Sequence, residues 1–119
     1  MDPKAQLFRL TEMEGVWELI LGTADFVSRP IIVIAQEQII EFVDKNKPSR
    51  LVINFKNVNH ISSEFITAMI QTRDHVVGHG GQMRFSHVNE LVRVPFEITQ
   101  LAGRLFTFYE TTAEAVDSF

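Results

Sequence analysis

The chain has 119 residues, of which 45% are hydrophobic and 22% are charged, so it is long enough for one domain around a single core. Its formal net charge of −4 is mild and argues against a nucleic-acid binder that works by neutralising phosphates. Because cysteine is absent, disulfides, thiol catalysis and thiolate metal sites are excluded, which suits a cytoplasmic protein.

The chain is expected to begin with a short tail and a hairpin. Residues 1–6 lack the apolar stretch of a signal peptide, and no apolar run approaches the roughly 20 residues that span a bilayer, so no membrane partner is expected. Apolar segments at 7–12 and 16–21 flank a turn at Glu14-Gly15, a pattern typical of two paired strands. Residues 22–29 then read as a loop.

A helix is expected to follow this loop. Ser28 and Pro30 are suited to the cap and the first turn of a helix, and apolar residues recur at helical spacing as far as Lys45. The β-branched cluster at 31–34 would also fit a strand, so that alternative stays open. The segment 46–48, which ends in proline, stops the element.

The central part of the chain carries the most informative pattern. Residues 51–55 are apolar apart from Asn54, which predicts a strand buried on both faces. A loop then leads to Ser62 and Ser63, which open an amphipathic helix that ends at the glycine-rich segment 78–81. The apolar stripe of this helix is expected to contain Ile66, Met69, Ile70, Arg73 and Val77.

The C-terminal part alternates strands and helices. Residues 82–86 read as a strand, and 95–101 as a short helix with Pro95 in its first turn and Gly103 just beyond its end. Residues 105–109 read as another strand, and Thr111 with Glu114 has the spacing of a capping box for a last helix that runs to Phe119. The order predicts a single α/β domain with a mixed, mostly parallel sheet of about five strands and about four helices.

Two serines at the start of a helix have two interpretations. The first-turn N–H groups have no intrahelical partner and the helix dipole is positive there, so a regulated phosphate would be favourable. The same serines are also what an ordinary helix cap looks like, worth ~1 kcal/mol.

The order of elements and several local motifs resemble the STAS domain family, which includes the anti-sigma factor antagonists of bacteria and related sulfate-transporter domains. The likeness covers residues 7–119. Further matches are the turn at 80–83, the segment 98–101 followed by Leu105-Phe106, and Glu114-Ala115 in the last helix. In the best-matching segment, Asn54 fits the family's strand end, Val58 and Ile61 its apolar loop positions, Ser63 its phosphorylated serine and Ile66 its leucine.

This resemblance implies a partner switch. The unphosphorylated domain would bind an anti-sigma factor with serine kinase activity and free the sigma factor, and phosphorylation of Ser63, or less favourably of Ser62, would break that complex. ATP would be bound by the kinase, so no cofactor is expected in this chain. The implied contact face consists of Asp25, His60, Ser62, Ser63, Glu64 and Phe65.

Three positions beside Ser63 depart from the family pattern. Ser62 replaces an aspartate, Glu64 replaces a second hydroxyl residue, and Phe65 replaces a glycine. Glu64 is either a solvated first-turn acid or a permanent charge that repels or partly mimics a phosphate. Phe65 is either an exposed partner contact or a residue packed under a neighbouring loop.

Other polar residues have structural interpretations. Asn54 is expected to be buried and to hydrogen-bond the backbone of the following loop. His60 lies just before the serines and could bond a phosphate or a partner. His75 and His79 are four residues apart, a spacing that binds metal on a regular helix, but the glycines around His79 favour a solvated helix end, and no metal is expected.

Two other functions remain as alternatives. The same fold could be a scaffold without a phosphate cycle, which binds a partner constitutively or self-associates as a homodimer through Phe65. A small enzyme using His60 with Ser63 would need a defined pocket and a residue that orients the histidine, and the sequence indicates neither. We therefore expect a regulatory protein and not an enzyme.

Overall fold

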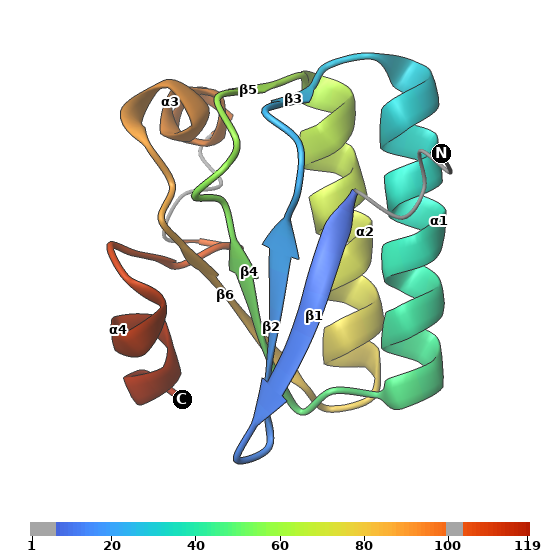
Figure 1. The fold of residues 1–119 in the computed structure, drawn as a ribbon, viewed down its shortest axis with the longest axis vertical. Helices are drawn as coiled ribbons and strands as arrows, with labels where there is room; N and C mark the ends of the chain where they lie inside the picture. Colours follow the sequence, from blue (N-terminus) through green and yellow to red (C-terminus); the bar gives the residue numbers. More distant parts are fainter. Residues whose placement is uncertain (1–6, 100–103) are drawn as a thin grey trace.

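A mixed sheet of five strands forms the centre of the fold in the computed structural model, which describes residues 7–99 and 104–119 (Figure 1). The strands are β1 (Phe8–Met13), β2 (Val16–Leu21), β4 (Arg50–Asn54), β6 (Gln82–Ser86) and β7 (Phe108–Tyr109), in the order β1-β2-β4-β6-β7. Only β1 is antiparallel to its neighbour. The predicted hairpin and the predicted mixed, mostly parallel sheet are therefore confirmed.

The described part of the chain contains four helices, which lie around this sheet. Figure 1 shows α1 (Arg29–Asn46) and α2 (Ser63–Gly78) side by side on one face, and α4 (Thr112–Asp117) on the other. The short helix α3 (Glu90–Ile98) lies near the ends of the parallel strands. Within residues 7–99 and 104–119, none of the helices has the length and apolar character that crossing a bilayer requires.

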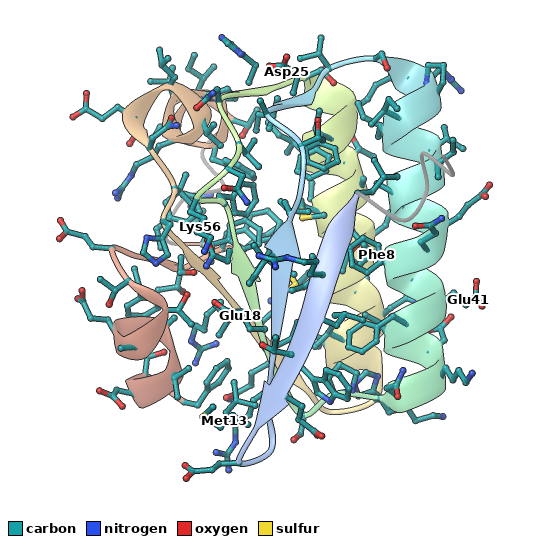
Figure 2. The ribbon with its side chains drawn as sticks, in the orientation of Figure 1. Phe8, Met13, Glu18, Asp25, Glu41 and Lys56 are labelled. Carbon is teal, nitrogen blue, oxygen red and sulfur yellow. The ribbon has the colours of Figure 1, made fainter. Side chains whose placement is uncertain are left out.

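The main core lies between the sheet and the pair α1 and α2, where Figure 2 shows side chains filling the space between the two layers. A smaller cluster on the opposite face joins α4 to the sheet through Ala115, Val16 and Val52. β4 contributes Leu51 and Ile53 to the main core and Val52 to the smaller cluster, so it is buried apart from its first residue, as its sequence predicts.

The segment that follows Ser28 is a helix, so the strand alternative for residues 31–34 is wrong. Its buried residues continue at helical spacing along one face, and this favours a helix over the local preference of β-branched residues. Pro30 stands in the first turn, where its missing N–H removes no hydrogen bond. At the other end Lys47 is left-handed with φ 47, and its N–H donates to the carbonyl of Val43.

The buried face of α2 differs from the predicted stripe. Val77 is 47% exposed, whereas Thr72 is fully buried and donates its hydroxyl hydrogen to the carbonyl of Ala68. The helix lies against both α1 and the sheet, so it buries a wider face than one stripe. The buried residues are Phe65, Ile66, Ala68, Met69, Thr72 and Val76.

Two predicted boundaries near the C-terminus are wrong. The helix predicted at 95–101 begins at Glu90, because Asn89 caps it by accepting a hydrogen bond from the N–H of Val92 at 2.9 Å. Pro95 is therefore inside the helix, and Gly103, the predicted stop, lies outside the described residues, as does the predicted tail 1–6. The strand predicted at 105–109 is only Phe108–Tyr109.

The cap predicted for the last helix is confirmed at Thr111, although Glu114 bonds the threonine hydroxyl and not the backbone N–H of a full capping box. Thr111 accepts a hydrogen bond from the N–H of Glu114 at 3.1 Å and donates its own hydroxyl hydrogen to the Glu114 carboxylate at 3.2 Å. The last helix nevertheless ends at Asp117, before Phe119.

Candidate functional site

Two loops lie side by side at the ends of β2 and β4. Within them, β3 (Asp25–Phe26) and β5 (His60–Ile61) form a small parallel ladder that the sequence does not predict. The N–H groups of Asn59 and His60 donate to the carbonyl of Ala24 at 2.7 and 3.1 Å. The N–H of Ser62 donates to the carbonyl of Phe26 at 3.0 Å, so the backbone holds the β4–α2 loop (residues 55–62) against the β2–α1 loop (residues 22–28).

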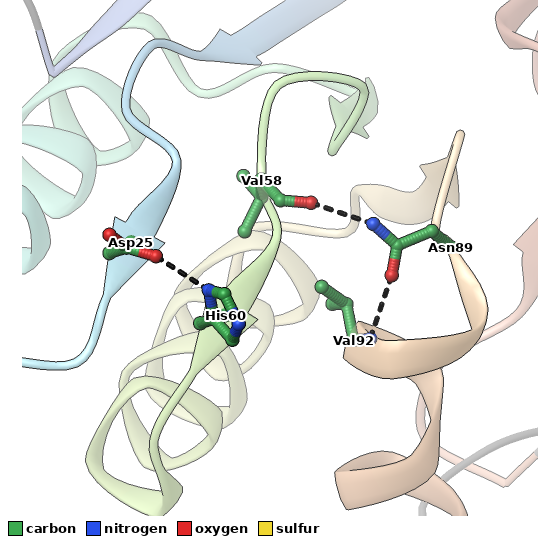
Figure 3. A network of polar contacts seen from close by, with 5 residues as sticks. All are labelled: Asp25, Val58, His60, Asn89 and Val92. Atoms are coloured by element: carbon green, nitrogen blue, oxygen red, sulfur yellow. Dashed lines mark hydrogen bonds and ion pairs between the residues drawn. The ribbon is translucent and has the colours of Figure 1, made fainter.

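This ladder brings Asp25 and His60 together. The Nδ1 atom of His60 lies 2.8 Å from the Oδ1 atom of Asp25, as Figure 3 shows, and both side chains are more than 60% exposed. The pair therefore forms a polar, solvent-facing part of the loop surface. The resemblance placed Asp25 near the two serines in space, and the structure places it on the strand paired with the one that precedes them.

The same loop is held from its other side by α3. Asn89 donates through Nδ2 to the carbonyl of Val58 at 3.0 Å while its Oδ1 caps α3 (Figure 3). One amide thus fixes both the start of a helix and the middle of the candidate loop. Sequence reasoning missed this residue, although Asn before Glu and an apolar run is a capping signal.

The two serines differ in exposure. Ser62 is the N-cap residue of α2, and Ser63 is its first residue. The hydroxyl oxygen of Ser62 is buried and has no hydrogen-bond partner among the described residues, whereas Ser63 is exposed. Ser62 makes no side-chain cap bond, so the predicted ordinary cap is not formed by its hydroxyl.

Glu64 is a solvated acid in the first turn of α2. Its side chain is 50% exposed, and its Oε2 atom lies 3.6 Å from a guanidinium nitrogen of Arg29 at the start of α1. Arg29 is itself 77% exposed, so solvent screens the interaction and the pair adds little to folding stability. The effect of Arg29 is local, because its positive charge partly offsets the negative charge of Glu64 beside Ser63.

Phe65 is buried, so the alternative of an exposed partner contact or a self-association contact is wrong. Its side chain is 1% exposed, and its ring stacks on Phe26 with centroids 4.5 Å apart. The ring also meets Phe55 edge-on at 6.3 Å. Phe65 therefore packs under the β2–α1 loop, the second alternative, and supports the candidate surface from below.

Asn54 confirms its predicted role at the strand end. It is 3% exposed, and its Oδ1 atom accepts a hydrogen bond from the backbone N–H of Lys56 at 2.8 Å. Its Nδ2 group donates to Glu18 and Thr112, neither of which the sequence analysis singled out. The available signal was the polar residue Glu18 in the otherwise apolar strand β2.

The two histidines near the end of α2 have separate partners. The Nδ1 atom of His75 lies 2.8 Å from Asp44 Oδ1, and the Nε2 atom of His79 lies 2.8 Å from the carbonyl oxygen of Pro48. In the part of the chain that the structure describes, no three His, Cys, Asp or Glu side chains gather as metal ligands would. The spacing of the pair is thus explained by contacts with α1 and the segment after it.

An enzymatic site needs His60 and Ser63 to act together. Asp25 is in a position to orient His60, because its carboxylate lies within hydrogen-bond distance of the ring. However, among the described residues the hydrogen bonds do not join His60 to Ser63.

Comparison with known proteins places this geometry in a family. The fold is similar to that of a Thermotoga maritima protein assigned as an anti-sigma factor antagonist (TM-score 0.81, 16% identity, 97% of this chain and 96% of that chain). It is also similar to an anti-sigma factor antagonist from Mycobacterium paratuberculosis (TM-score 0.79, 21% identity, 98% of this chain and 95% of that chain). A third similar structure is the Bacillus cell fate determinant SpoIIAA in its phosphorylated form (TM-score 0.68, 16% identity, 93% of this chain and 97% of that chain).

These identities are low, so the three structures establish the shared fold alone. A search of the curated proteins finds no match. The model of the STAS domain, however, matches residues 13–115, which include both loops and all the strands except β1, of which only Met13 is matched. The chain belongs to the STAS domain family.

Proposed function

We propose that this chain is a regulatory, non-enzymatic switch of the anti-sigma factor antagonist type, with Ser63 as the phosphate acceptor. The observation that carries the proposal is the difference between the two serines. Ser63 is exposed in the first turn of α2, whereas the hydroxyl oxygen of Ser62 is buried. A kinase must surround the hydroxyl that it modifies, so only Ser63 is accessible without unfolding the helix start.

The position of Ser63 determines what a phosphate would do. A phosphate adds about −1.5 to −2 charges at neutral pH, and the N-terminus of a helix tolerates such an anion well. We therefore expect the fold to persist after phosphorylation. The effect falls on a partner bound over the loops, which would meet a bulky anion beside Asp25, His60 and Glu64.

The departures from the family pattern are compatible with this role. The ring of Phe65 points into the core, so the surface near Ser63 stays free of an aromatic side chain. Glu64 is close to Arg29, which offsets part of its charge and reduces its repulsion of a phosphate. Ser62 lacks the charge of an aspartate, and the Asp25 carboxylate on the adjacent strand supplies a nearby acid.

The partner we propose is an anti-sigma factor with serine kinase activity, in the cytoplasm. The similar structures include anti-sigma factor antagonists, and SpoIIAA has been solved in a phosphorylated form. ATP would be bound by the kinase. The contact surface on this chain would contain Asp25, His60, Ser62, Ser63 and Glu64, with Phe65 beneath it.

The test uses the two serines as matched variants. The purified chain is incubated with ATP and each anti-sigma factor kinase of the source cell, and the modified residue is identified by mass spectrometry. We expect phosphate on Ser63, none on Ser63→Ala, and normal modification of Ser62→Ala, because the Ser62 hydroxyl makes no hydrogen bond that its removal would break. Binding should fall at least about tenfold for Ser63→Glu, or about 1.4 kcal/mol. Equal binding of the partner by Ser63→Ala and Ser63→Glu would contradict the switch.

The surface of α3 favours a second candidate, a scaffold that binds its partner constitutively. Leu91, Val94 and Ile98 share one face of the helix and are 69%, 47% and 75% exposed. Exposed aliphatic residues grouped in this way are typical of protein-binding surfaces. This candidate is supported if Ile98→Asp abolishes binding to the same partner while Ser63→Ala and Ser63→Glu bind equally.

A further inference from the structure

A partly buried polar network connects the C-terminal helix to the start of the β4–α2 loop. Thr112, the first residue of α4, donates its hydroxyl hydrogen to Glu18 Oε2 of β2 at 2.8 Å. Its Oγ1 atom also lies 2.9 Å from the hydroxyl of Ser86 in β6 and 3.3 Å from Asn54 Nδ2 in β4. One hydroxyl therefore contacts three neighbouring strands of the sheet.

The donors and acceptors of this network match completely. Thr112 donates its single hydroxyl hydrogen to Glu18, so Ser86 must be the donor in the contact between the Ser86 and Thr112 hydroxyls. Asn54 uses its two Nδ2 hydrogens on Glu18 Oε2, at 3.0 Å, and on Thr112. Its orientation is therefore fixed from the side of α4, because a flipped amide would face the Glu18 carboxylate with an oxygen.

The same amide holds the base of the β4–α2 loop. The Oδ1 atom of Asn54 accepts a hydrogen bond from the N–H of Lys56 at 2.8 Å. Ser86 contributes there as well, since its carbonyl accepts from the N–H of Phe55 at 2.9 Å. Figure 2 shows Glu18 on β2 and Lys56 where the chain leaves β4, at the two ends of this connection.

We propose that Thr112 is a positioning residue for the β4–α2 loop, because the docking of α4 fixes the Asn54 amide and the amide fixes Lys56. Thr112 and Glu18 lie at a distance from Ser63 in the sequence and act through Asn54. Any change that lifts the start of α4 from the sheet would loosen the loop before it disturbs the main core. Any effect of Thr112 on a phosphate switch at Ser63 rests on the proposed function, whereas the structural link between α4 and the loop does not.

The apolar contacts of α4 do not explain this arrangement. Ala115 packs on Val16 and Val52, with Val116 and Phe119 beside it, and these contacts hold the helix against the sheet without a fixed direction. The partly buried Thr112 hydroxyl, which contacts three strands, adds orientation to this apolar contact, since each hydrogen bond has a preferred direction. Among the side chains of this network, only that of Asn54 bonds directly to both the network and the loop backbone, because Ser86 reaches the loop through its main-chain carbonyl.

The test measures amide hydrogen exchange in the full chain by NMR. The reporters are the hydrogen-bonded loop amides of Lys56, Val58, Asn59, His60 and Ser62. We expect Thr112→Val to increase their exchange about fivefold to tenfold, the usual effect of one lost hydrogen bond on a local opening equilibrium. Thr112→Ser keeps the hydroxyl and should restore slow exchange, which a purely steric role would not predict.

A matched control separates this link from general loosening of α4. Ser118 lies at the other end of the helix, where it contacts Arg84 and the carbonyl of Ala115. Ser118→Ala should therefore leave the loop amides unchanged. The β4 amides of Leu51 and Ile53 report global unfolding and should stay slow in all variants.

The double variant Asn54→Ala with Thr112→Val tests whether Thr112 acts on the loop through Asn54. In an Asn54→Ala background the loop is already released, so adding Thr112→Val should produce no further increase. If Thr112→Val proves too unstable to study, Ser86→Ala removes only the donor to Thr112 and should act in the same direction. Exchange that rises in α4 alone, or effects of Asn54→Ala and Thr112→Val that multiply, would overturn the proposal. Neither outcome depends on whether Ser63 is ever phosphorylated.

Discussion

Truncation of Phe65 is the most direct test of how the candidate surface is supported. The ring is 1% exposed, stacks on Phe26 at 4.5 Å and meets Phe55 at 6.3 Å. Replacing a buried phenylalanine by alanine typically lowers the free energy of unfolding by about 3–5 kcal/mol. Each aromatic pair contributes ~0.5–1.5 kcal/mol beyond the buried area, so the upper part of that range is expected for Phe65→Ala.

The assay is urea unfolding followed by circular dichroism, with thermal unfolding beside it. For a domain of this size, a loss of this magnitude corresponds to a decrease in Tm of roughly 12–20 °C. Ile98→Ala is the control, because Ile98 is 75% exposed and should change the free energy of unfolding by less than about 0.5 kcal/mol. A loss below about 1 kcal/mol for Phe65→Ala would refute the inward placement of the ring and return Phe65 to the partner surface.

Two further predictions concern the frame of the site and the turn that follows α2. Asn89→Ala removes the cap of α3 and the bond to the carbonyl of Val58, so urea unfolding should show a loss of about 1–2 kcal/mol. Gly81→Ala places a Cβ atom 2.5 Å from the backbone oxygen of Pro48, and should lower stability by more than about 2 kcal/mol. Gly78→Ala, whose Cβ meets nothing within 4 Å at the end of α2, should instead be neutral or stabilise by up to about 1 kcal/mol in the same assay.

The sheet and the longer helices could be predicted because their patterns are local. The hairpin is marked by two short apolar segments around a glycine turn, the strand at 51–55 by a continuous apolar run, and the helix after Ser28 by an apolar period. The start of α3 was missed because Pro95 suggested a first turn, while the cap at Asn89 is a single residue. A proline inside a short helix is the less common arrangement, and only the contacts of Asn89 decide it.

The candidate loop could be located but its contacts could not. The two residues of β3 and the two of β5 are too short to carry a period, so the pairing of Asp25 with His60 has no sequence signature. The burial of Phe65 was equally hidden, because α2 lies between α1 and the sheet and buries more than one stripe. Thr112 was not singled out, because its three polar contacts come from strands far away in the sequence.

The contacts of the β4–α2 loop separate its frame from its surface. Asn54 holds its first residues, Asn89 holds its middle, and Phe65 packs beneath its end, and all three act through buried or partly buried groups. Ser63 and the Asp25–His60 pair face solvent, and they make few contacts that the fold depends on. Under the proposed function, we therefore expect a phosphate on Ser63 to leave the fold intact and to weaken the complex with a partner. A sequence can accordingly change Ser62, Glu64 and Phe65 from the family residues and still present an exposed serine on a fixed helix start.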